Sequence, residues 1–103
     1  MRIDLTCPVE MWHCQMPTQD YPVLTMEIYN LSEKDVKSIQ VCLLCYDREG
    51  ELYARQVERI QGLDAPSHHA FEATMAAEDA VVAQDMEVLI EKVWYEDGTV
   101  WRR

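Results

Sequence analysis

The segment SIQVCLLCYD, residues 38–47, is the most strongly β-like stretch of the chain. Side chains of an extended strand point alternately to two faces, and here apolar residues recur at every second position. One face carries Ile39, Val41, Leu43 and Cys45. The opposite face carries Ser38, Gln40, Cys42, Leu44 and Tyr46. The alternation predicts a strand that packs on a core and has additional apolar side chains on its second face.

The same alternation predicts six more strands on both sides of this segment. They cover residues 2–11, 23–30, 52–60, 70–75, 87–95 and 100–103. Pro8 lacks the N–H that a ladder hydrogen bond needs, so the first of these strands must lie at a sheet edge or break midway. Residues 47–51, DREGE, predict a hairpin loop in which Gly50 takes a positive φ. The alanine-rich residues 76–85 fit a helical turn and the frayed start of a strand equally well.

The last hairpin has the clearest turn signal, because EDGT at residues 96–99 separates two apolar stretches. A two-residue type I′ loop at Asp97 and Gly98 would set the register of the two strands. It pairs Glu96 with Thr99, Tyr95 with Val100 and Trp94 with Trp101. The two indoles would then lie side by side. Apolar parity also changes between Ile90 and Val93, which predicts a β-bulge near Glu91 or Lys92.

These features together predict an all-β fold, an immunoglobulin-like sandwich of about seven antiparallel strands in two sheets. The chain has seven short predicted strands, hairpin signals, no long amphipathic helix and no internal repeat. Its 103 residues are a typical length for one domain, so we expect residues 1–103 to form a single sandwich.

Four short stretches then suggest a family. They are NLSEKDV (30–36), YDREGEL (46–52), APS (65–67) and YEDGTVW (95–101). With the strands between them, they resemble small bacterial immunoglobulin-like modules of the FxLYD type. The resemblance implies a turn containing Asn after the second strand and a Tyr-Asp turn after the third, and it implies no catalytic residues.

Localisation is an expectation that depends on where the native chain begins. Modules of the FxLYD type commonly belong to secreted or envelope proteins. This sequence instead runs from Met1 directly into strand sequence, without the apolar core and cleavage site of a signal peptide. If Met1 is the native start, we expect the protein in the cytoplasm.

The charge balance restricts the choice of partner. Nineteen acidic residues stand against nine basic ones, and the formal net charge is −10 at pH 7. Phosphate backbones and anionic lipids are bound by Lys and Arg, so we expect no nucleic-acid partner. No uncharged run exceeds nine residues, and one of the two longest, residues 11–19, contains several polar residues and a proline. We therefore also expect no insertion into a membrane.

The CLLC motif has the spacing of many zinc and redox sites. Its context argues against such a site, because residues three apart on an extended strand face opposite sides. We therefore interpret Cys42 and Cys45 as structural thiols in a strand. A disulfide between Cys7 and Cys14 would require their Cα atoms to lie within about 7 Å.

A zinc site is the alternative basis for function. Zn²⁺ accepts both thiolate and imidazole, and the available ligands are Cys7, His13, Cys14, His68 and His69. With such a site, the chain would be a small zinc-binding regulator using Cys and His. The spacing does not fix these residues near one another, so we assign no metal site and no cofactor.

No residue pattern indicates catalysis. Cys14 follows His13, but adjacency in sequence does not provide an activated nucleophile held by a third group. The chain has no Gly-rich phosphate loop, and its turn carboxylates lack the spacing of a calcium loop. A sandwich this small also has little room for a deep pocket. We predict that the chain is not an enzyme, and an enzyme of undetected type is the third alternative.

The strongest functional indication is an excess of apolar side chains on two strands, residues 38–47 and 87–95. These strands neighbour each other in an immunoglobulin-like sheet, and each needs only one apolar face. The outward candidates are Cys42, Leu44, Tyr46 and Leu89. Such patches mark contacts with another chain unless a loop, the N-terminal segment or Trp12 covers them. We predict a non-catalytic protein-binding or assembly module that acts through a sheet face or edge, with a protein partner or a second copy of itself.

Overall fold

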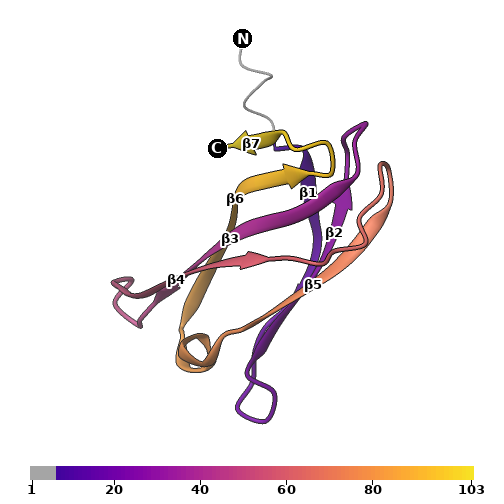
Figure 1. Cartoon of the computed structure of the whole chain (residues 1–103). Coiled ribbons are helices and arrows are strands. Elements are labelled where there is room, and N and C mark those ends of the chain that lie inside the picture. The colour runs from indigo at the N-terminus through magenta and orange to yellow at the C-terminus, as the bar shows by residue number, and fades with distance from the viewer. Residues whose placement is uncertain (1–6) are drawn as a thin grey trace.

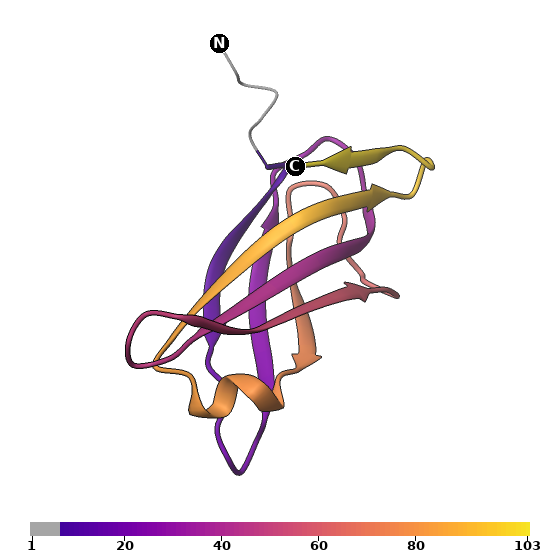
Figure 2. The ribbon, with the colours of Figure 1, turned by 90° about the vertical axis from the view of Figure 1, so that its left-hand side faces the viewer.

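Two antiparallel β-sheets make up most of residues 7–103, the part of the chain that the computed structural model describes (Figure 1). The smaller sheet has the order β1 (Val9–Gln15), β2 (Val23–Asn30), β5 (Ala70–Ala76). The larger sheet has the order β4 (Leu52–Ile60), β3 (Val36–Tyr46), β6 (Asp85–Tyr95), β7 (Val100–Arg102). Figure 2 shows the larger sheet lying across the smaller one as a second layer. The predicted all-β, two-sheet sandwich is confirmed.

The strand order is that of an immunoglobulin-like sandwich. The first, second and fifth strands share one sheet, and the remaining four share the other. This arrangement corresponds to strands A, B and E facing strands C′, C, F and G. Within residues 7–103, β5 has no further strand on its outer side, where a constant-type immunoglobulin domain carries strand D.

The core consists of the inward faces of the two sheets, where period-two alternation places apolar side chains. β2 and β3 supply most of the largest fully buried ones, which are Leu24, Met26, Ile28, Val36, Ile39, Val41 and Leu43. Phe71 of β5 and Val93 of β6 are also buried. Burial of one such side chain contributes about 2 kcal/mol relative to leaving it exposed. The predicted inward face of residues 38–47 is therefore confirmed.

A short 3₁₀ helix, η2 (Glu78–Val82), joins β5 to β6 at one end of the sandwich (Figure 2). Of the two alternatives for residues 76–85, the helical turn is the one observed. Ala80 of η2 is buried against the core. No helix within residues 7–103 is long and apolar enough to cross a membrane.

The turn after β2 is held by the buried side chain of Asn30. Its Nδ2 donates hydrogen bonds to the carbonyl oxygens of Lys34 (2.9 Å) and Ala65 (3.0 Å). Its Oδ1 accepts from the backbone N–H of Ser32 (3.0 Å) and from the Ser32 hydroxyl (2.7 Å). One amide thus ties the turn to the loop before β5. The predicted turn containing Asn is observed.

The strand predicted at residues 2–11 overlaps β1 at residues 9–11. Residues 1–6 lie outside the described part, and β1 begins after Pro8 and continues to Gln15. A register shift between Met11 and His13 leaves Trp12 as an extra residue, which is a β-bulge. The bulge interrupts simple alternation, so counting every second residue could not locate the end of the strand. β1 is an edge strand that starts just after Pro8, as the proline predicted.

The register predicted for the last hairpin is wrong by one residue. Trp94 pairs with Val100, and Val93 pairs with Trp101. The loop has three residues rather than two, because the N–H of Tyr95 bonds to the oxygen of Thr99 (2.9 Å). Gly98, with φ of 90°, supplies the left-handed residue that such a loop needs after a tight turn.

This register separates the two indoles. Trp101 packs against the core, whereas Trp94 lies on the outward face of the larger sheet, with the guanidinium carbon of Arg59 3.9 Å from its ring centre. The turn itself is held by Asp97, whose carboxylate accepts hydrogen bonds from the hydroxyl and the N–H of Thr99. These bonds, with the nearby Lys34 ammonium, lower the pKa of Asp97 to about 2.

The other strands lie close to their predicted places. β2 and β4 coincide with residues 23–30 and 52–60, and Gly50 in the β3–β4 loop has a φ of 80°. The bulge predicted in the sixth strand is also confirmed. Gln40 pairs with Lys92 and Val41 with Ile90, which leaves Glu91 as the extra residue.

Candidate functional site

The candidate site is the outward face of the larger sheet, where the four predicted contact residues lie. Cys42 of β3 is opposite Val57 in β4 on one side and opposite Leu89 in β6 on the other. These three residues form a line across three strands, which we call the apolar row. Leu44 and Tyr46 continue the same face of β3.

Exposure differs among the predicted contact residues. Leu44, Tyr46 and Leu89 are each partly exposed, whereas Cys42 is only 2% exposed. Val57, which the sequence reasoning did not select, is 40% exposed. Val57 was missed because the neighbouring charged residues of β4 obscure the alternation of apolar residues along that strand. Leu44, Tyr46, Leu89 and Val57 are therefore apolar side chains that a partner could contact, as are Leu52, opposite Tyr46, and Trp94 on the same face.

The thiol of Cys42 lies beneath a charged pair. Arg55 of β4 and Glu91 of β6 approach to 3.6 Å, and because β3 lies between these strands their side chains meet over it. Gln40 donates to the same carboxylate at 3.0 Å. Burial, followed by the negative charge of Glu91, raises the pKa of the Cys42 thiol. The chain thus covers the centre of the apolar row with its own polar side chains, and not with a loop or Trp12.

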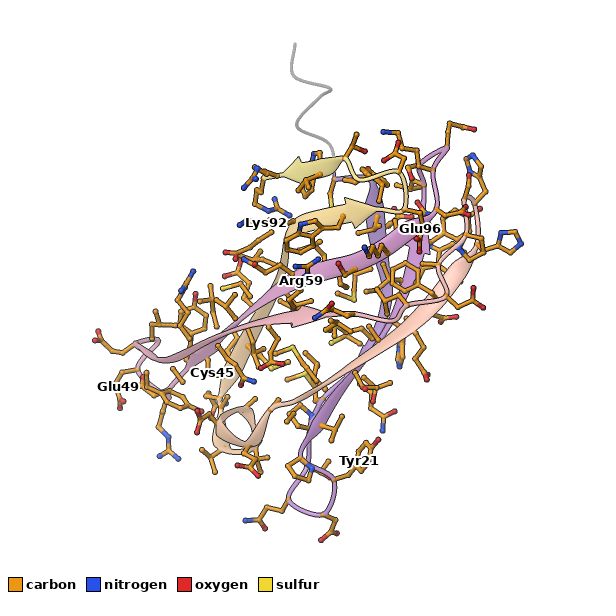
Figure 3. All side chains as sticks on the ribbon, in the orientation of Figure 1. Tyr21, Cys45, Glu49, Arg59, Lys92 and Glu96 are labelled. Carbon is orange, nitrogen blue, oxygen red and sulfur yellow. The ribbon has the colours of Figure 1, made fainter. Side chains whose placement is uncertain are left out.

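Apart from the Arg55–Glu91 pair over Cys42, the charges on this face differ between its two ends. At one end, Arg59 of β4, Lys92 of β6 and Arg102 of β7 lie in one row across the strands. Figure 3 shows Arg59 and Lys92 near each other at the end of the sheet that β7 completes. The other end carries Asp85 and Glu87, and Glu87 accepts a hydrogen bond from the Tyr46 hydroxyl at 3.2 Å. The apolar row lies between a basic end and an acidic end.

The two cysteines of CLLC point to opposite faces, as the strand alternation predicted. Cys45 belongs to the core, whereas Cys42 lies on the outward face. Burial raises the pKa of both thiols, so both are held as neutral, unreactive groups. Cys7 and Cys14 are also free thiols, each partly buried against the core, and they form no disulfide with each other.

The residues considered for a zinc site are dispersed. On β1, His13 is exposed, whereas the side chain of Cys14 packs against the core. His68 contacts the carboxylate of Glu33 at 2.9 Å, and a ring nitrogen of His69 lies 2.8 Å from a backbone oxygen. Among residues 7–103, no three His, Cys, Asp or Glu side chains are grouped so that they could hold a metal ion.

A second surface, on the smaller sheet, was not predicted from the sequence. Trp12 lies two residues after Glu10 on the outward face of β1, where its ring stacks on Tyr29 of β2 with centroids 4.6 Å apart and planes 8° from parallel. Trp12 nevertheless remains 53% exposed. Alternation continued past residue 11 would have placed Trp12 on this face, but it does not reveal the stacking partner on β2.

A shallow depression of about 430 Å³ adjoins this stack. It crosses all three strands of the smaller sheet and is lined by His13, Gln15, Thr25, Glu27, Ala70, Phe71 and Glu72. Its charged lining is therefore acidic.

Comparison with known proteins informs the fold alone. No family model matches the chain, and no curated protein matches it. A hypothetical protein of Peptoclostridium difficile 630 has a similar solved structure, with a TM-score of 0.69 and 12% sequence identity, covering 95% of this chain and 87% of that one. A Northeast Structural Genomics Consortium target aligns with a TM-score of 0.42 and 17% identity over 89% of this chain and 73% of its own. The first likeness shows that the sandwich recurs in another protein, while the resemblance to FxLYD-type modules stays a prediction.

Proposed function

We propose that the chain is a non-catalytic protein-binding module that uses the outward face of the larger sheet, and that its simplest partner is a second copy. The observation that carries the proposal is the apolar row, with Leu44 beside it, on a face that needs no apolar residues for the core. A side chain such as Val57 gains free energy when another protein removes it from water.

The charge pattern of the face favours a second copy as occupant. Consider a twofold axis that lies in the interface at Leu89 and runs across the strands. It would bring the basic end of one copy against the acidic end of the other. Lys92 and Glu87 lie at nearly equal distances along β6 on either side of that axis. Each would then face its opposite charge in the partner, as an isologous interface requires. The net charge of −10 opposes association in general, so a specific pairing of charges is needed.

Sedimentation equilibrium tests this proposal with one apolar substitution. We expect the wild-type chain to dimerise, and we expect Leu44→Glu to weaken the dimer at least tenfold, because it places a charge in the apolar centre of the interface. Thr74→Glu, an exposed strand position on the smaller sheet, is the matched control and should not alter the dimer. A wild-type chain that stays monomeric up to about 1 mM contradicts pairing between copies.

A charge exchange tests the orientation of the two copies. Lys92→Glu and Glu87→Lys should each weaken the dimer, because each places like charges together. The double variant should restore it, since the charges are then exchanged but still complementary. Failure of the double variant to recover would rule out the twofold arrangement. Pull-downs with wild type and Leu44→Glu provide the test for a different protein partner, and identical captured proteins would contradict the surface itself.

A further inference from the structure

The free face of the Trp12 ring is the starting point. One face of the indole is stacked on Tyr29, and the side chain is still 53% exposed, so its other face is open to solvent. The indole N–H donates to the carboxylate of Glu10 at 3.0 Å, which fixes the orientation of the ring. A large aromatic ring held flat and uncovered on a strand surface is unfavourable in water. It is, however, the best of the aromatic faces for binding a cation.

The charges around the ring also select a cation. The strands β1, β2 and β5 contain no Lys or Arg, and their three carboxylates, on Glu10, Glu27 and Glu72, all lie on the outward face. In contrast, β4, β6 and β7 carry Arg55, Arg59, Lys92 and Arg102. The face that holds the aromatic stack is therefore uniformly acidic, and it complements a positively charged ligand.

The length of the depression indicates how long such a ligand is. It begins at His13 and Glu27, beside the stack, and reaches Glu72 on the edge strand β5. Its length across three strands suits several residues of an extended chain rather than one small ion. The alkyl stem of a Lys or Arg would lie across Thr25 while its charged end meets a carboxylate.

We infer that the outward face of the smaller sheet is a second binding surface, whose ligand is a Lys- or Arg-containing peptide segment of another protein. Trp12 provides the aromatic face for one cationic side chain, and Glu27 and Glu72 provide countercharges for the next. This surface is on the opposite side of the sandwich from the apolar row, so it does not depend on the proposed function.

Capped tetra-arginine is a suitable probe, observed in ¹H–¹⁵N NMR spectra through the indole N–H signal of Trp12 and, for variants that lack the indole, through the backbone N–H signals of Glu27 and Glu72. We expect the peptide to shift that signal and to leave those of Trp94 and Trp101 unchanged. Trp12→Ala should lower the affinity about fivefold or more, and Trp12→Phe should retain part of it. Tyr21→Ala is the control, since Tyr21 is an equally exposed aromatic residue, at 54%, in a loop outside this face. Equal affinities for Trp12→Ala and Tyr21→Ala would overturn the inference.

A second pair of variants separates a specific site from general attraction to an acidic protein. Glu27→Gln with Glu72→Gln should weaken binding severalfold, whereas Glu49→Gln with Glu51→Gln, in the exposed β3–β4 loop, should have a small effect. The same loss in both pairs would show nonspecific attraction. Capped tetra-glutamate and uncharged cellohexaose complete the test. A Trp12 response to either of these, with none to tetra-arginine, would also overturn the inference and in the second case indicate a glycan ligand.

Discussion

At the scale of single residues, Asn30 shows how one polar side chain can be buried in an apolar core without loss of stability. It has no exposed surface, yet both ends of its amide are satisfied by hydrogen bonds to Ser32, Lys34 and Ala65. A buried amide without partners would cost several kcal/mol, so these bonds must form together. The side chain therefore links the turn after β2 to the loop before β5.

Replacement of this amide should destabilise the sandwich. Asn30→Ala removes four hydrogen bonds at once and leaves the N–H of Ser32 without its acceptor, and we expect it to lower the free energy of unfolding by about 3 kcal/mol. Ser32→Ala removes only the hydroxyl and should cost about 1 kcal/mol. Urea unfolding followed by circular dichroism measures both. Equal losses for the two variants would contradict the central role of the Asn30 amide.

At the scale of elements, sequence periodicity predicted strands well wherever alternation is uninterrupted. β2 and β4 coincide with their predicted residues, and the parity change in β6 correctly indicated the bulge at Glu91. The bulge at Trp12 was missed because the first strand was predicted to end at Met11, so the change in parity of the core positions from Met11 to Cys14 lay beyond it. The predicted contact residues on β3 and β6 do share a face. The cover over Cys42 depends on contacts between strands that a single sequence does not reveal.

The β6–β7 loop was mispredicted because Asp-Gly fits two loop types. A two-residue loop needs positive φ at both residues, but in this chain the positive φ occurs at Gly98 and not at Asp97. The Asp97 side chain instead accepts hydrogen bonds from Thr99, which suits a turn with ordinary φ before the glycine. Loop length, and with it the register, was therefore decided by the conformation of a single residue.

Gly98 should be the most sensitive position of this hairpin. Nothing lies within 4 Å of where a Cβ would be, so the cost of a substitution is backbone strain alone. We expect Gly98→Ala to lower the free energy of unfolding by about 1 kcal/mol and Gly98→Asn by less, since Asn tolerates the left-handed region. Urea unfolding measures the losses, with Glu96→Ala as the control. In NMR spectra, a cross-strand contact between the α-protons of Trp94 and Val100 would support this register, and one between those of Tyr95 and Val100 would refute it.

At the scale of the whole molecule, the sandwich separates two surfaces of different chemistry. The larger sheet combines apolar, basic and acidic residues, while the smaller sheet has an aromatic stack among carboxylates. The core between the sheets keeps the two outward faces on opposite sides (Figure 2). The two proposed surfaces therefore do not overlap, and together the proposals predict that both can be occupied at once.

The labelling rates of the two thiols of β3 test the outward face and the core separately. Cys45 lies in the core, so a reagent reaches it only when the sandwich opens, whereas Cys42 is covered from outside by the Arg55–Glu91 pair. Iodoacetamide labelling near pH 8.5, read by peptide mass spectrometry, should modify both slowly in the wild type, because burial raises both pKa values. In Glu91→Ala, which removes both the cover and the negative charge that raises the pKa of Cys42, this thiol should react severalfold faster while Cys45 keeps its wild-type rate. Glu49→Ala, in the exposed β3–β4 loop, should change neither. If Cys42 stays as slow as Cys45 after Glu91→Ala, then packing within the sheet shields it, and the charged pair does not.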